Sequence, residues 1–541
     1  MENKIELNKN IDLAEKSEQN FARELQSDIV LPDYCDDINR IIRVDAKPII
    51  KNKYANKDVA RVNGVIAVTV IYISDPYKQL RSFSFTNDFD YSFDIPGIMS
   101  NHKMLVSMEV GELNCRLLNP RKMTVRVDTG VVIKSSENRS GGVNNLNNLK
   151  DFESPDAYSD LNSLNSLPLL NPNNSGEYDG IQVEKLKRNF EICDMLVGSG
   201  EAKIDENIPI TEGVAANEII YADVNINVDE IKPLYNKAVV KFTSDVKLLY
   251  NAIDDKNEYV RLTKKIPSTQ VVDIDDLDEK YECTAKINLS SLKTDIDIDQ
   301  YGENKIINVD FICQIEVSAF KNDEQEIIID AYTPRYENSV LNESIKTQRY
   351  KGIYKEKQSV EDSIVLEEMA VETVMDATGV IVINSTLVGD SVITVNSNAE
   401  VSVMVKGLED EIQNLDCSIP IKTEINAGEK LNNAAADVTG YISDIEAIVE
   451  SNKLTVKVAV NFECVVFENE TCNMLKAILV DTDKPKFSRK DVQMIIYYPN
   501  KGENLWSIAK KYDSQVSKIM KYNKCESQNI SDKKIIIVPK V

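Results

Sequence analysis

The chain has 541 residues, a length that accommodates three or four domains, each able to bury a hydrophobic core. Its 88 acidic residues outnumber the 63 lysines and arginines, and the net charge of -25 excludes nonspecific binding of nucleic acid or anionic lipid by most of the protein. The nine cysteines include no CxxC pair, so the sequence predicts neither a disulfide framework nor a structural zinc site.

The first 30 residues predict one amphipathic helix, because Leu13, Phe21, Leu25 and Ile29 recur at near-helical spacing. The same stretch is polar and has no apolar segment behind a basic start, so we expect no secretion signal. The longest apolar run begins at Gly64 and has about ten residues, against the roughly 20 that a spanning helix needs. We therefore expect a cytosolic protein without direct membrane insertion.

Strands dominate from residue 31 onward, where β-branched residues alternate with polar ones. Three passes through one order of motifs predict three β modules, at residues 31–136, 181–340 and 359–485. In the first two passes LPDYCDDINRIIRVDAKPII parallels IPITEGVAANEIIYADVNINVDEI, and the next strands align Tyr72 with Tyr250. The third pass is the most divergent.

Residues 137–180 separate the first two modules. They are rich in Asn, Ser, Gly and Pro and lack periodicity, which predicts a flexible linker. The leucines of this segment leave two interpretations open, namely contact with a partner or collapse of the loop on itself.

The last segment, residues 491–541, reverses the charge of the chain with nine lysines against five acidic residues. A strand from Met494 ends at Pro499, and Asn504 is placed to cap a helix with the sequence LWSIAKKY. A second helix, QVSKIMKYN, and a second strand, IIIVP, complete the predicted order of strand, helix, helix and strand.

That order, together with GENLWSIAKKY, SQVSKIMKYN and ISDKKIIIVP, resembles the LysM domain. In that family a shallow groove binds chitin or peptidoglycan. The resemblance places the groove at Gly502, Glu503, Asn504, Leu505, Asn529 and Ile530.

This chain departs from the LysM pattern at the groove. It has Asn504 where the family usually has Thr, and Asp532, Lys533 and Lys534 where the family usually has a Pro-Gly-Gln turn. A sugar groove needs small residues that let the backbone approach the ligand, so the two lysines favour an acidic protein ligand over a glycan.

Trp506 is the only tryptophan, and two interpretations of it stay open. It fills the core beneath the first strand, or it is a partly exposed residue of an interface. The neighbouring lysines are either a solvated helix face or a binding face. The candidate partner-binding residues are Trp506, Lys510, Lys511, Lys518, Lys521, Lys533 and Lys534.

β repeats that begin with LPDYCDDINRIIRVDAKP, contain RLLNPRKMTVRV and precede a LysM unit resemble the clostridial spore-coat morphogenetic proteins with SPOCS repeats. The resemblance implies a mainly β fold class, with tandem SPOCS repeats followed by a small α+β (βααβ) LysM domain.

In function, the resemblance implies a noncatalytic adaptor of the mother-cell cytoplasm that lies at the forespore surface. Its partners there are other coat proteins and SpoIVA, the ATPase of the coat basement layer, which it binds through the LysM domain. Attachment to peptidoglycan or chitin through the LysM groove is the alternative.

The sequence contains no local motif of a catalytic or metal-binding site. His102 is the only histidine, and neither a GxxxxGK[ST] loop nor a GxGxxG motif occurs. The string TDIDIDQYGE starts like a calcium loop at Asp295, but Gln300 stands where that loop needs Gly. We expect no catalytic residue, bound metal or cofactor.

Overall fold

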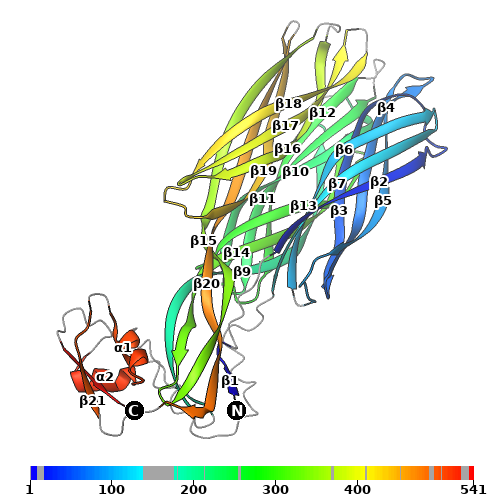
Figure 1. Cartoon of the computed structure of the whole chain (residues 1–541). Helices are drawn as coiled ribbons and strands as arrows, with labels where there is room; N and C mark the ends of the chain where they lie inside the picture. The colour runs from blue at the N-terminus through cyan, green and yellow to red at the C-terminus, as the bar shows by residue number, and fades with distance from the viewer. Residues whose placement is uncertain are drawn as a thin grey trace.

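The computed structural model describes residues 2–8, 17–100, 102–137, 176–178, 181–211, 214–253, 258–366, 371–408, 411–450, 453–486, 493–500, 503–525 and 535–540. Strands make up most of this part of the chain, and its two short helices lie near the C-terminal end (Figure 1). Most of the predicted linker at 137–180 lies outside the described residues. Within the described ranges no helix is both long and apolar enough to cross a bilayer.

Module 1 is a sandwich of two three-stranded antiparallel sheets. Its strands are β2 (Ser17–Val30), β3 (Asp37–Asn56), β4 (Val59–Asp75), β5 (Leu80–Asp94), β6 (His102–Asn119) and β7 (Lys122–Glu137). They form the sheets β2-β7-β6 and β3-β4-β5, and the two inner faces bury a shared core that includes Ile66, Val68, Val125 and Val127.

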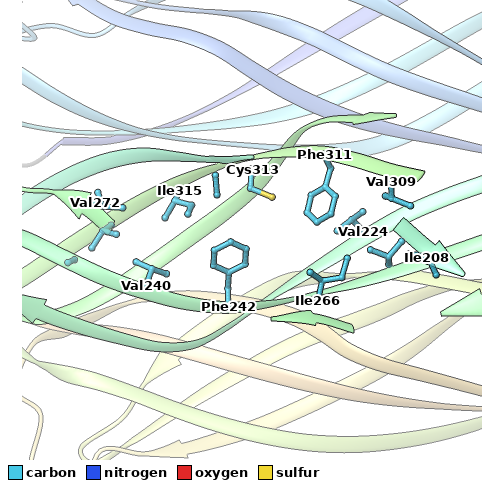
Figure 2. Close-up of a cluster of buried hydrophobic side chains, with 14 of the residues drawn as sticks. Ile208, Val224, Val240, Phe242, Ile266, Val272, Val309, Phe311, Cys313 and Ile315 are labelled. Carbon is cyan, nitrogen blue, oxygen red and sulfur yellow. The ribbon is translucent and has the colours of Figure 1, made fainter. Parts of the chain in front are cut away.

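Modules 2 and 3 repeat this topology. Module 2 consists of β9 (Ile181–Pro209), β10 (Ala216–Leu234), β11 (Lys237–Ala252), β12 (Tyr259–Asp273), β13 (Glu282–Asp297) and β14 (Ile306–Tyr332). Module 3 consists of β15 (Tyr336–Val365), β16 (Val371–Val388), β17 (Val392–Gly407), β18 (Ile412–Asn426), β19 (Ala434–Glu450) and β20 (Lys453–Pro485). In every module the last strand pairs with both the first and the fifth. Figure 2 shows Phe242 and Phe311 from the two sheets of module 2 pointing toward each other in its core.

Two sequence expectations differ from this architecture. The prediction of a helix in the first 30 residues is wrong for Ser17–Val30, which form β2. The spacing of Phe21, Leu25 and Ile29 fits a strand as well, because four residues are two full periods of a strand, and pairing with β7 supplies the backbone hydrogen bonds. The predicted boundaries at 340 and 359 fall inside the continuous strand β15.

The three modules meet around a pseudo-threefold centre. The first strands of the meanders, β3, β10 and β16, each contain three β-bulges at the same spacing. Arg43, Tyr221 and Asp376 each follow the second bulge, so they occupy equivalent positions. They lie together: the guanidinium of Arg43 is 2.9 Å from Asp376 and sits 4.5 Å from the ring centroid of Tyr221. A single buried polar cluster therefore joins all three modules.

A stalk extends from the sandwiches (Figure 1). It consists of residues 181–194 of β9, 321–332 of β14, 336–348 of β15 and 469–485 of β20, together with β1 (Glu2–Glu6) and β8 (Gly176–Tyr178). Apolar residues such as Val183, Ile328, Leu475 and Ile478 pack between its two ribbons. Asn8 ties the ribbons together, because its side-chain amide donates to the carbonyls of both Ile328 (3.0 Å) and Leu475 (2.9 Å).

The chain ends in a small α+β unit beside the tip of the stalk (Figure 1). It consists of β21 (Met494–Tyr497), α1 (Leu505–Lys511), α2 (Val516–Asn523) and β22 (Ile536–Pro539). β21 and β22 pair antiparallel. The order strand, helix, helix and strand is the one that the sequence predicted.

Candidate functional site

The C-terminal unit, residues 493–540, is fixed by local capping and a small core. The side-chain oxygen of Asn504 accepts a hydrogen bond from the N–H of Ser507 at 2.9 Å and so caps α1, as predicted. Leu505, Ile508 and Ala509 are buried on one face of that helix. Asn523 closes α2 against β22 by donating to the carbonyls of Ile519 (2.8 Å) and Ile537 (2.6 Å).

The described residues of the predicted groove have structural tasks. The carboxylate of Glu503 accepts hydrogen bonds from the N–H of Asn500 (2.7 Å) and from the hydroxyl of Tyr497 (2.9 and 3.0 Å), and these bonds lower its pKa. Asn504 caps α1, and Leu505 is fully buried. The other predicted groove positions, Gly502, Asn529 and Ile530, lie outside the described residues.

Trp506 faces the stalk. Its side chain is only 4% exposed, and its indole N–H donates to the carboxylate of Asp330 at 2.9 Å. The indole ring meets the ring of Tyr332 edge to face, with centroids 5.0 Å apart. Trp506 therefore fills a core that Ile495 and Tyr497 of β21 join from the unit and that Tyr332 and Leu186 join from the stalk.

Further polar contacts hold the same face. The ammonium of Lys510 lies 2.8 Å from both carboxylate oxygens of Asp330. The hydroxyl of Tyr332 donates to the carbonyl of Ser514 at 2.7 Å, and Lys486 at the end of the stalk pairs with Asp513 at 2.6 Å. We call the surface formed by Trp506, Lys510 and Ser514 the α1 face.

The remaining predicted lysines are spread over the unit. Lys511 lies over the rings of Tyr497 and Tyr512, at 5.1 and 5.5 Å from their centroids. Lys518 is half-buried near the buried carboxyl of Glu184, while Lys521 is exposed. Lys533 and Lys534 lie outside the described residues. The structure thus brings Trp506 and Lys510 together but does not gather the described lysines on one face.

An apolar surface on this unit was missed by the sequence analysis. Met494 and Ile496 alternate along β21, Tyr498 directly follows it, and Ile535 precedes β22; all four are exposed, Ile496 by 66%. We call them the outer sheet face. The signal was present in MIIYY, where a two-stranded sheet with helices on one side leaves every second apolar residue in solvent.

We find no metal-binding or catalytic site among the described residues. No group of His, Cys, Asp and Glu there is arranged to hold a metal ion. Burial raises the pKa of the Cys313 and Cys464 thiols to about 12, so neither is a ready nucleophile. A cleft of about 660 Å³ between modules 2 and 3 is lined by Asn, Ser, Thr, Gln, Asp and Lys residues together with Val228, Tyr441, Ala459 and Val460, without His or Cys.

Comparison with known families assigns these parts. The family described as "SipL, SPOCS domain" matches residues 37–118 and 215–297, and the LysM domain family matches residues 500–539. The two SPOCS matches start at equivalent positions, at the first residue of β3 and one residue before β10, and module 3, outside the matches, shares their topology. No curated protein matches the chain. SPOCS and LysM are families of noncatalytic binding domains, and the chain is similar to them in one order, with two SPOCS matches before a C-terminal LysM match.

Proposed function

We propose that this protein is a noncatalytic adaptor of the spore coat. Its LysM domain binds the SpoIVA-type ATPase of the coat basement layer, and its SPOCS modules form the scaffold that meets other coat proteins. In this role it works in the mother-cell cytoplasm, at the forespore surface, and helps the coat to encase the forespore. The combination of SPOCS domains with a terminal LysM domain supports the proposal.

One observation carries the proposal furthest: the LysM domain stands at the tip of the stalk, away from the three modules (Figure 1). Its sequence carries an excess of lysines on a chain whose net charge is -25. A basic module on an acidic body attracts an acidic partner to one place and repels it elsewhere. The outer sheet face adds exposed apolar area, which is typical of a protein interface.

Glycan binding is the second candidate, because LysM domains bind chitin or peptidoglycan. The described groove residues Glu503, Asn504 and Leu505 are engaged in holding a turn, a helix cap and the core. These roles support a protein ligand over a sugar. The experiment therefore needs one arm for each ligand.

The test is a titration of the full chain against purified SpoIVA-type ATPase and, separately, against chitin oligomers and peptidoglycan, at low and high salt. We expect salt-sensitive binding of the ATPase and no saturable response to the glycans. Lys521→Glu and Ile496→Ser should weaken binding, whereas Lys203→Glu, an exposed lysine of module 2, should leave it unchanged. Saturable binding of glycan alone would overturn the adaptor function.

A further inference from the structure

The stalk presents a carboxylate and an aromatic ring to the α1 face. Asp330 and Tyr332 lie two residues apart at the end of β14, directly after a β-bulge that shifts the register with β9. A bulge turns the following side chains away from the regular alternation of the strand. Asp330 and Tyr332 thereby both reach the LysM domain.

Both stalk residues make specific contacts with the α1 face. The carboxylate of Asp330 accepts from the indole of Trp506 and the ammonium of Lys510, and also from the N–H of Ala331 at 2.9 Å. Tyr332 adds the ring contact with Trp506 and the hydrogen bond to Ser514. Charge-assisted hydrogen bonds of this kind are specific for an acidic group.

The contact between the LysM domain and the stalk can open without loss of the domain's own core. The LysM domain has a core of its own, formed by Leu505, Ile508, Val516, Ile519, Ile536 and Val538. The shared apolar contact with the stalk is small and centres on Trp506, Tyr332 and Leu186. Separation from the stalk would therefore expose Trp506, Tyr332 and Leu186 but would not remove the domain's own core residues.

We infer that the α1 face is a binding site for an extended segment that presents an acidic residue and, two residues later, an aromatic one. The chain's own Asp330 and Tyr332 fill this site, and the partner binds the LysM domain by displacing them. The inference rests on the proposed function and adds a self-masking contact to it. The measured affinity of a masked site is its intrinsic affinity multiplied by the fraction of molecules in which the site is open.

The sole tryptophan reports the contact directly in the full chain. Asp330→Ala removes the acceptor for both Trp506 and Lys510. We expect the emission of Trp506 to shift to longer wavelength and its quenching by acrylamide to increase. We also expect the ATPase to bind the variant at least tenfold more tightly than the unmodified chain.

Two further variants sharpen the test. Asp310→Ala changes an exposed aspartate of the same strand within module 2 and should alter neither fluorescence nor affinity. Asp330→Asn keeps the shape of the acceptor but loses the charge, so it should give an intermediate shift and an intermediate affinity.

The outcomes separate the inference from the proposed function. An exposed Trp506 in Asp330→Ala with unchanged or weaker ATPase binding would overturn the self-masking and leave the adaptor function standing. An unchanged Trp506 emission would overturn it as well, because Asp330 would then not hold the domain. Failure of both the variant and the unmodified chain to bind the ATPase would overturn the proposed function itself.

Discussion

Replacement of Arg43 by Met tests the pseudo-threefold centre. The Arg43 side chain is 2% exposed, and it pairs with Asp376, which is 3% exposed, and with Asp45 at 3.0 Å. It also covers the ring of Tyr221. Met has a similar length and no charge, so the substitution removes the cation without leaving a large cavity. The carboxylate of Asp376 is then buried without its countercharge.

The size of the effect follows from that uncompensated carboxylate. Breaking a buried ion pair by removing one partner costs about 3 to 5 kcal/mol, and the lost cation–π contact is contained within that range. For a cooperative unit of one module, about 4 kcal/mol lowers the midpoint of thermal unfolding by roughly 15 °C. An exposed pair provides the control: Arg126, 49% exposed beside Glu24 and Asp128, should cost less than about 1 kcal/mol when changed to Met.

Scanning calorimetry of the full chain measures both variants. We expect Arg43→Met to lower the first unfolding transition strongly and Arg126→Met to leave it nearly unchanged. The double variant Arg43→Met with Asp376→Leu replaces the pair by apolar groups and should recover most of the loss. The reasoning is refuted if the two single variants unfold together, or if the double variant is no more stable than Arg43→Met.

Two other predictions concern single positions. Burial raises the pKa of Glu184 to about 7, although the charge of Lys518 opposes the shift. Between pH 4.5, the ordinary pKa of a glutamate, and pH 7, the carboxyl is therefore protonated in the folded chain and ionised in the unfolded chain. The free energy of unfolding falls as the pH rises through this range. Glu184→Gln should raise the unfolding midpoint at pH 8 and not at pH 4, and an equal gain at both would contradict this account. A Cβ on Gly64 would lie 2.0 Å from the carbonyl oxygen of Ile49, whereas a Cβ on Gly130 would meet nothing within 4 Å. We therefore expect Gly64→Ala to destabilise module 1 by about 2 kcal/mol or more, measured by urea unfolding, and Gly130→Ala to leave its stability unchanged.

Much of the fold could be predicted from local patterns. The alternation of β-branched and polar residues predicted strands, and the register confirms the proposed alignment of Tyr72 with Tyr250, since they pair with the equivalent residues Ile41 and Ile219. Asn504 was predicted as a helix cap because the interaction spans only three residues. Elements of this kind depend on neighbours in the chain, and their signals are written in short stretches of sequence.

The site was predicted less completely than the fold. The sequence predicted the lysines and the tryptophan of the LysM domain as candidate binding residues, but it could not indicate what they face. Trp506 and Asp330 are 176 residues apart, and no local pattern links them. The outer sheet face could have been found, because its alternation lies within one short strand.

By itself the sequence determined the strand-rich character of the chain from residue 31 onward, the order of elements in the LysM domain and the reversal of charge between body and end. Tertiary structure alone decided that residues 17–30 are a strand, that Arg43, Tyr221 and Asp376 meet, and that the stalk covers Trp506. The physical reason is the same in each case. A spacing of four residues suits a helix and a strand equally, and a buried charge or ring is stable only beside partners that the folded chain brings from far away.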